Sequence, residues 1–386
     1  MSTKKETEEV MRRMEARRRA AEKKRRRTKR TLIIVGVVLA VLLILVGMVY
    51  GIFHHYYNLM HHDNGTTNPS ILSTISPDDD VDPTATNSDK NAIDKAHDNI
   101  NKGQAADIVF HDNVYNLLLI GTDARDLENE RGRSDSMIVV SINKATKKIT
   151  MTSVMRDTYL HIPEVGYNRV NAAYSYGGAP LLVQTLEENF GFKIDNYMIA
   201  NFGVFKEIVD VVGGVDLDVS ASEIEVMNRY IREYNRVISY EDEDTDVMDY
   251  SDAGYTHLNG KQALAYCRVR YVGNGDFDRT GRQREVMDLI IQKCKSMSVS
   301  DLNKLAETVL PWLTTDLSAT GALSLASAAI LNGYYKYDIQ SLRIPGDETW
   351  DGIMVDGMSV LSIDFDANRD LFFETVYGKS YGDMVG

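Results

Sequence analysis

The sequence predicts an α/β domain in which helices flank a mixed, mostly buried β-sheet (an α/β/α sandwich), preceded by one transmembrane helix. Two observations support this prediction. Short apolar runs typical of buried strands alternate with helical patterns through residues 108–386. An uncharged apolar run of 23 residues, 31–53, lies before them. Such a helix would extend roughly 35 Å, enough for the hydrocarbon core of a bilayer.

The charge of the N-terminal arm predicts the orientation of this span. Residues 1–30 contain fourteen Lys or Arg and five Glu, a local charge of +9, whereas the whole chain carries −13. Positive residues stay on the cytoplasmic side, so the arm is predicted to be cytoplasmic and the acidic remainder extracellular. A cleaved signal peptide is the alternative, but its apolar region would be shorter. The arm is interpreted as a topology signal that also touches anionic lipid, and no nucleic-acid partner is expected.

Residues 54–107 are predicted to be an extracytoplasmic spacer. They are rich in Asp, Asn, Ser, Thr and Pro and have little apolar periodicity, although 91–103 has the character of a short helix. Four histidines follow the apolar run, and an interfacial belt is favoured over metal binding for them: His54, His55, His61 and His62.

The globular domain is expected to begin at residue 108 with strands over 113–121, 136–143 and 148–155. The turn at 146–148 predicts a hairpin between the last two. A helix is expected over 179–191, because apolar residues recur every four positions and Gly191 is a plausible stop. The next elements are predicted at 194–202 (strand), 203–214 (helix) and 215–220 (strand).

Residues 221–256 are predicted to be an exposed excursion rather than core. Their acidic run at 241–246 is interpreted as solvated surface, with calcium binding as the alternative. The remaining elements are expected at 258–271 (a helix capped by Asn259 that leads into an extended segment), 280–297, 301–313 and 318–331 (helices), 337–344 and 352–363 (strands), and 364–378 (helix).

Two aspartates and a set of arginines carry the chemical signal. Asp123 leaves the first strand and Asp135 enters the second, a pair suited to a hard metal ion with a phosphate. Guanidinium groups match phosphate oxygens two at a time. Arginines gather in glycine-marked segments at positions 125, 131, 133, 156, 169, 268, 270, 279, 282 and 284.

Spacing indicates how these side chains could meet. In an extended segment Arg268 and Arg270 would point to the same face, and Arg279 and Gln283 share one face of a helix that begins near Thr280. The alternative is that each arginine forms an ordinary surface ion pair. Two apolar helical stretches, 203–212 and 284–294, are candidates for the lining of a lipid tunnel, with ordinary core packing as the alternative.

The order of the segments GTDAR, GRSDSM, SVMRDTYL, NRVNAAYSYGG, IVDVVGGV, LNGKQALAYCRVR and GDFDRTGRQR resembles the LytR-CpsA-Psr family of bacterial cell-envelope proteins. The resemblance is specific over residues 113–296, the motif core. The extension 297–386 agrees with the family only in its general character. Departures from the usual family pattern are Met155 for proline, Asp278 for glycine, Cys267 for alanine and Arg169 for lysine.

The resemblance implies a membrane-anchored phosphotransferase. Such a protein ligates an anionic glycopolymer, of the wall teichoic acid or capsular polysaccharide type, from a polyprenyl-pyrophosphate carrier to peptidoglycan, with the assistance of Mg²⁺. It implies that Asp123 and Asp135 associate with the metal. The expected pyrophosphate contacts are Arg133, Arg156, Arg268, Arg270, Arg279 and Gln283, with Arg125 and Arg169 as weaker candidates. Asp123, Asp135, Arg156 and Arg268 are the expected catalytic residues, without a covalent nucleophile.

Two other functions remain open at this level: a non-catalytic envelope regulator or transcriptional attenuator, and a hydrolase of polyprenyl pyrophosphate. The only two cysteines, Cys267 and Cys294, are interpreted as free thiols, with a disulfide as the alternative.

Overall fold

The structure is a computed structural model that describes residues 50–63, 85–105, 107–122, 132–270, 272–273 and 275–386. The chain divides into two compact units, 1–57 and 58–386. In the first unit, residues 50–57 are helical. The predicted arm, and the predicted membrane span apart from residues 50–53, lie outside the described residues. No helix within the described ranges combines the length and the hydropathy that a membrane crossing requires.

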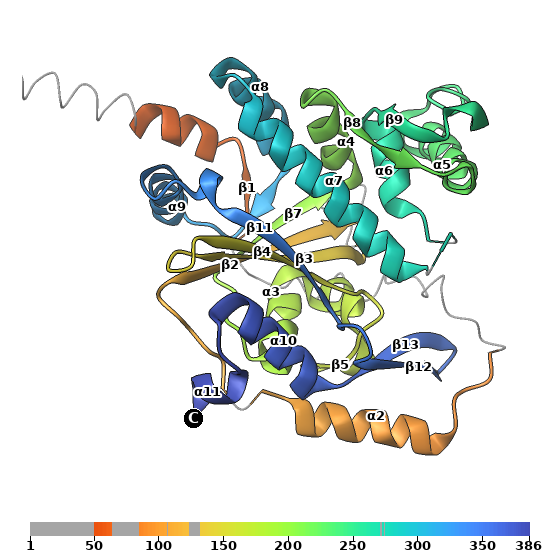
Figure 1. The fold of residues 1–386 in the computed structure, drawn as a ribbon, viewed down its shortest axis with the longest axis vertical. Coiled ribbons are helices and arrows are strands. Elements are labelled where there is room, and N and C mark those ends of the chain that lie inside the picture. The colour runs from red at the N-terminus through yellow and green to blue at the C-terminus, as the bar shows by residue number, and fades with distance from the viewer. Residues whose placement is uncertain (1–49, 64–84, 106, 123–131, 271, 274) are drawn as a thin grey trace, which may run out of the picture. The chain divides into compact units, whose positions relative to one another are not determined.

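The second unit is built around a seven-stranded mixed sheet (Figure 1). β3 is antiparallel to both β2 and β4, whereas β7 is parallel to β2 and β11 is parallel to β4. This arrangement confirms the predicted mixed α/β fold. In spatial order the strands are β1 (His61–His62), β10 (Thr314–Thr315), β7 (Asn196–Asn201), β2 (Val114–Thr122), β3 (Ser134–Asn143), β4 (Lys148–Val154) and β11 (Asp338–Ile344).

The central strands form because both of their faces are covered. Leu118, Ile120 and Val139 are almost fully buried in a cluster on one side of the sheet, and Leu118 lies opposite Val139 in the β2–β3 ladder. Strands buried on both faces read as continuous apolar runs, which is the pattern of LLLI and MIVV. β3 and β4 are joined by a turn in which Lys147 has φ 56°, so the predicted hairpin is confirmed.

Helices lie on both sides of this sheet (Figure 1). One side carries α3 (Val170–Phe190), α10 (Phe365–Tyr377), α2 (Lys90–Gly103) and α11 (Tyr381–Val385). The other carries α4 (Phe202–Val211), α6 (Gly260–Arg268), α7 (Asp276–Ser296) and α8 (Val299–Val309). The remaining helices are α5 (Ala221–Tyr234), α9 (Ala319–Leu331) and the short η2 (Asn235–Ser239), η3 (Tyr250–Asp252), η4 (Leu310–Trp312) and η5 (Tyr334–Lys336).

Two helices begin a turn or more before the predicted start. α3 starts at Val170 and continues through a kink at Gly178 (φ 66°) to its stop at Gly191, whose φ of 76° caps the helix as predicted. α7 starts at Asp276 rather than near Thr280. α2 lies within the segment predicted to be a spacer, and its Ala96 and Ile100 belong to the core, so the ordered domain includes this helix.

Three two-stranded sheets accompany the main one: β5 (Tyr159–Ile162) with β6 (Gly166–Arg169), β8 (Val215–Val219) with β9 (Gly254–Leu258), and β12 (Trp350–Val355) with β13 (Met358–Ile363). The single strand predicted over 352–363 is therefore wrong, because it is a hairpin. Asp356 and Gly357 both have positive φ, the conformation that a tight Asp-Gly hairpin turn requires.

The prediction that 221–256 is an exposed excursion is also wrong. Ser220 and Glu223 form a capping box that starts α5. Ile224, Met227 and Ile231 are then fully buried in a second hydrophobic cluster formed with α4, α6 and α7. Their spacing of three and four residues is that of a helix face, so the segment is part of the core.

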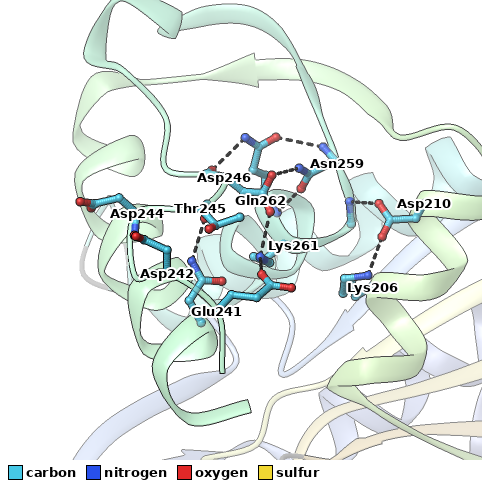
Figure 2. A network of polar contacts seen from close by, with 12 residues as sticks. Lys206, Asp210, Glu241, Asp242, Asp244, Thr245, Asp246, Asn259, Lys261 and Gln262 are labelled. Atoms are coloured by element: carbon cyan, nitrogen blue, oxygen red, sulfur yellow. Dashed lines mark hydrogen bonds and ion pairs between the residues drawn. The ribbon is translucent and has the colours of Figure 1, made fainter. Parts of the chain in front are cut away.

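The acidic run at 241–246 is held against this cluster by a buried lysine (Figure 2). Lys261 is only 4% exposed, and its ammonium lies 2.7 Å from Glu241 and 2.8 Å from Asp246. Asn259 and Gln262 also donate hydrogen bonds to Asp246. A protein cation therefore occupies the position that the calcium alternative would require. Within the described residues, no group of three or more Asp, Glu, His or Cys is placed to hold a metal ion.

Candidate functional site

A cavity of about 380 Å³ lies between the sheet and helices α4 to α7. Its apolar lining comes from the sheet (Leu119, Ile120, Ile138, Met198 and Ala200) and from the helices and the segment before β10 (Phe205, Ile208, Leu264, Met287 and Leu313). Phe205 and Ile208 belong to one predicted tunnel stretch and Met287 to the other. Its polar lining includes Asp135, Arg156, Arg268, Arg270, Arg279 and Gln283. Six of the predicted site residues therefore meet at one apolar cavity.

An irregularity in the β2–β3 ladder places Asp135. Gly121 lies opposite Ser136, and Thr122 lies opposite Ser134, so Asp135 is the extra residue of a β-bulge. A bulge re-aims the side chain of its unpaired residue, and bulges are frequent beside active sites. A Cβ on residue 121 would lie only 3.0 Å from the Ser136 side chain, so glycine permits this close approach.

Arg156 follows the end of β4, beside the start of β3. Its Nη1 donates to Oδ1 of Asp135 at 2.7 Å, and the side chain is 5% exposed. Burial raises the pKa of the Asp135 carboxyl, but Arg156, Arg279 and Arg270 outweigh it, and the net pKa lies below the ordinary value. The carboxylate is therefore ionised at neutral pH.

α7 contributes Arg279 and Gln283, which lie one turn apart and both line the cavity. Arg279 donates to the backbone oxygen of Asp135 at 3.4 Å, and Gln283 donates to that of Cys267 at 3.4 Å. Arg282 faces away from this set. It binds Glu223 at 2.7 Å and the backbone oxygen of Val269 at 3.0 Å, so it braces α7 against α5.

Arg268 and Arg270 reach the cavity by a different route from the one predicted. The extended segment expected there is wrong for Arg268, because this residue is the last one of α6. Its guanidinium lies 4.5 Å from the ring centroid of Tyr230 and 3.8 Å from the carboxylate of Glu233, both on α5. Arg270 follows the helix end and approaches Asp157 at 3.9 Å.

Asp157 contacts three arginines of this region, and the sequence did not reveal this cluster. Its carboxylate lies 3.5 Å from Arg156, 3.1 Å from Arg169 and 3.9 Å from Arg270. Its place next to Arg156 in the sequence does not predict the contacts with Arg169 and Arg270. Tyr230 was missed as well, because its segment was interpreted as an excursion. The capping box and helical periodicity of α5 were the signals that could have placed it.

The other predicted residues are placed less directly. Arg169 is 2% exposed at the start of α3 and belongs to the Asp157 cluster, outside the cavity lining. Arg133 is half-buried just before β3 and is likewise absent from that lining among the described residues. Asp123 and Arg125 lie outside the described residues.

The chemistry of Asp135 fits a magnesium ligand. Mg²⁺ prefers one or two carboxylates together with water and phosphate oxygens. Asp135 offers an ionised carboxylate of which only Oδ1 is used by Arg156 in the contacts above.

The cysteines are free thiols, as the sequence interpretation favoured. Cys267 lines the cavity, but burial raises the pKa of its thiol well above the ordinary value. It is therefore uncharged at neutral pH and unsuited to act as a nucleophile. The cavity thus offers cations and one carboxylate, an arrangement suited to binding a polyanion rather than to covalent catalysis.

Comparison with known proteins gives three findings. The family model described as LytR_cpsA_psr family matches residues 83–372. A protein named polyisoprenyl-teichoic acid–peptidoglycan teichoic acid transferase TagV, from Bacillus subtilis (strain 168), is 30% identical over 272 residues, 68% of this chain and 66% of that protein. A relative with the same transferase name, TagU from Enterococcus faecalis, is 34% identical over 232 residues, 59% of this chain and 70% of that protein.

A solved structure described as TagT bound to LIIa-WTA is similar in fold. It has a TM-score of 0.53 and 25% sequence identity, and the match covers 71% of this chain and 96% of that one. The named relatives are thus transferase enzymes, and the chain spans about two thirds of the length of the first of them.

Proposed function

The chain belongs to the LytR_cpsA_psr family, and from that premise we propose that it is a membrane-anchored phosphotransferase. Its reaction ligates an anionic glycopolymer, of the wall teichoic acid or capsular type, from a polyprenyl-pyrophosphate carrier to peptidoglycan. The observation that carries this proposal is the meeting of Arg156, Arg268, Arg270 and Arg279 with Asp135 at an apolar cavity. Transferase relatives that act on polyisoprenyl-linked teichoic acid support it.

The two parts of the cavity correspond to the two parts of such a donor. A polyprenyl chain is apolar and suits the aliphatic and aromatic lining. A pyrophosphate is a polyanion, and the arginines from the end of β4, the end of α6 and the first turn of α7 can bind its oxygens through paired N–H groups. Phosphoryl transfer depends mainly on positioning and on stabilising charge, which these groups provide without a nucleophile from the protein. A hydroxyl of the acceptor sugar would form the new P–O bond to the polymer-linked phosphorus, and the bond to the second phosphate would break, so that polyprenyl phosphate leaves.

Magnesium belongs to this proposal. Asp135, together with the predicted partner Asp123, would hold the ion beside the arginines. When bound, Mg²⁺ supplies positive charge that neutralises the phosphate oxygens. Arg156 would keep the Asp135 carboxylate oriented, because the two are joined by a hydrogen bond of 2.7 Å.

The location is proposed from the sequence. An uncharged segment at 31–53 would anchor the chain in the cell membrane by a single pass, with the basic arm in the cytoplasm and the domain outside. A lipid-linked donor and a wall acceptor are both reached from that surface. The partners are then the donor, membrane lipid and peptidoglycan.

A transfer assay tests the proposal. The full chain in lipid vesicles would receive a polyprenyl-pyrophosphate-linked teichoic acid precursor, Mg²⁺ and peptidoglycan sacculi, and polymer covalently bound to the sacculi would be measured. Arg268→Ala should lower the transfer rate about 10²-fold, because one cation is lost where charge develops. The control is Arg232→Ala, a half-exposed arginine of α5 that pairs with Asp244; it should leave the rate within about twofold.

The other outcomes separate the alternatives. Free polymer in place of wall-bound polymer would indicate a pyrophosphate hydrolase. Neither product from the wild-type chain would favour a regulator and would contradict the transferase. Equal rates for the Arg268→Ala and Arg232→Ala variants would show that the cavity is not the site of transfer.

A further inference from the structure

A second cavity, of about 500 Å³, lies on the other side of the sheet. It is formed by α2, by the loop that leads into β12, and by the junction between β13 and α10. In Figure 1 α2 runs alongside the β12–β13 hairpin, on the side of the domain away from α4. No residue of this cavity is shared with the arginine site.

We propose that this cavity binds a saccharide segment of the acceptor glycan. The inference rests on the proposed function and adds an acceptor site to it. An aromatic ring, Trp350, lines the cavity together with an amide, Asn99, and with charges of both signs, Lys95, Asp351 and Asp366. The negative face of an aromatic ring attracts the C–H face of a sugar. Amide and carboxylate groups match sugar hydroxyls as donors and acceptors.

The charges favour one kind of saccharide. Lys95 and Lys102 on α2 face a rim that carries Glu348, Asp351 and Asp366. A neutral glucan can hydrogen-bond to these groups, but it offers no charge to pair with either sign. A peptidoglycan strand, whose peptide stems carry both carboxylate and ammonium groups, can pair with both sets.

An aromatic contact links this cavity to the arginine site. The Trp350 ring lies 4.6 Å, between centroids, from Phe277 in the first turn of α7. Arg279 follows two residues later on the same helix and lines the first cavity. The guanidinium of Arg343 also lies 4.5 Å from the Phe277 centroid. The Trp350 ring would therefore lie between a bound acceptor and the helix turn that presents Arg279 to the donor.

Intrinsic fluorescence tests the proposal in the full chain. The sequence has two tryptophans, so Trp312→Phe leaves Trp350 as the only one. In this background, in lipid vesicles, the probe is a soluble peptidoglycan tetrasaccharide with peptide stems, and maltotetraose is the comparison. A saturable change in Trp350 emission with the first sugar, and none with the second, is expected.

A charge reversal provides the matched pair of variants. Lys95→Glu should raise the dissociation constant for the peptidoglycan fragment about five- to tenfold, because a cation of the cavity becomes an anion. Lys90 is an equally exposed lysine of the same helix that does not line the cavity. Lys90→Glu makes the same charge change there and should leave the dissociation constant unchanged.

The outcomes are distinct from those of the donor test. No saturable change, an equal response to maltotetraose, or equal constants for the two lysine variants would overturn the acceptor site. Lys95→Glu should leave polyprenyl pyrophosphate binding unchanged. If the chain binds the peptidoglycan fragment as expected but transfers no polymer, the transferase proposal fails while the saccharide site stands.

Discussion

The carboxylate of Asp157 is shared by three guanidinium groups, two of which are almost fully buried. Arg156 is 5% exposed and Arg169 is 2% exposed, and both lie within 3.5 Å of it. A buried cation that loses its anion keeps its desolvation penalty, so one removed carboxylate weakens several positions at once. Asp157 therefore holds the arginines of the site in place without itself lining the cavity.

Asp157→Asn should lower the free energy of unfolding by about 2–4 kcal/mol at neutral pH, because the buried Arg169 loses a carboxylate at 3.1 Å and Arg156 is left with its contact to Asp135. Urea unfolding followed by circular dichroism measures this. The matched control is Asp366→Asn, since Asp366 is 89% exposed in its ion pair with Arg369. That variant should change stability by less than about 1 kcal/mol. If both variants changed the free energy of unfolding equally, Asp157 would not be what holds these arginines in place.

Tyr377 gives a prediction about alkaline pH. Burial, with a smaller contribution from Asp195, raises the pKa of Tyr377 to about 12, and Asn116 donates a hydrogen bond to its hydroxyl at 3.1 Å. The pKa of Tyr377 in the folded protein exceeds the unfolded value near 10. The protonated hydroxyl therefore contributes to the free energy of unfolding in full below about pH 10, and this contribution is lost as pH rises toward 12. About 1.4 kcal/mol should be lost by pH 11.

Tyr377→Phe removes this titration. Its free energy of unfolding should therefore fall less between pH 9 and pH 11 than that of the wild type, by about 1.4 kcal/mol. Urea unfolding at the two pH values measures the difference. Tyr255→Phe, at a tyrosine that is 79% exposed, is the control and should keep the wild-type pH dependence. A wild-type slope in the Tyr377→Phe variant would contradict the interpretation.

At the scale of elements, the position of the start of α6 is fixed by its close approach to α4. The backbone N–H of Gly260 donates to Asp210 of α4 at 2.7 Å. A Cβ on residue 260 would overlap the backbone oxygen of Lys206 and the Asp210 carboxyl. At the other end of α6, Arg268 stacks on Tyr230. The glycine thus fixes the start of the helix whose last residue reaches the cavity.

Gly260→Ala should destabilise the protein by about 1–3 kcal/mol, because α4 and α6 must move apart. The control is Gly281→Ala in α7, where the added Cβ meets nothing within 4 Å. There alanine should be neutral or stabilising by up to about 1 kcal/mol through its helix propensity. Urea unfolding of both variants measures the contrast, and an unchanged Gly260→Ala variant would mean that the contact can relax.

Elements were predictable from sequence where local pattern and burial agree. The apolar run in 113–121 and the repeat of Leu182, Leu186 and Phe190 identified β2 and much of α3. α5 failed because polar residues dominate its composition, although its buried positions keep helical spacing. The bulge at Asp135 depends on the pairing of two strands, which no local pattern encodes. The end of α6 at Arg268 is a helix boundary, and periodicity locates such boundaries only to within a few residues. The segments that carry the site could therefore be predicted, but not how each one delivers its side chain.

At the scale of the whole molecule, the cavity is bordered by separately packed hydrophobic clusters, one of which, Val204, Val309 and Leu313, contacts Met198 and Ala200 of its lining. A second cluster contains the α3 and α10 side of the sheet, and a third contains α4 to α7 with β8 and β9. Natural cores are packed nearly without voids. Apolar side chains such as Leu119, Ile138 and Met198 instead line about 380 Å³ of open space. The free protein therefore gives up packing energy that a bound apolar chain could restore.

Ala200→Leu tests this trade between stability and binding. Ala200 lies on β7 and lines the cavity, so three added carbon atoms should fill part of it. The free energy of unfolding of the free protein, measured by urea unfolding, should rise by about 0.5–1.5 kcal/mol, because the added carbon atoms cover apolar lining of the cavity. Affinity for a polyprenyl pyrophosphate should fall at least about tenfold, because the lipid competes for the same volume.

Ala326→Leu, at an exposed position of α9, should change neither quantity appreciably. A less stable Ala200→Leu protein would mean that the cavity cannot take the added carbons, and unchanged lipid affinity would place the polyprenyl chain elsewhere.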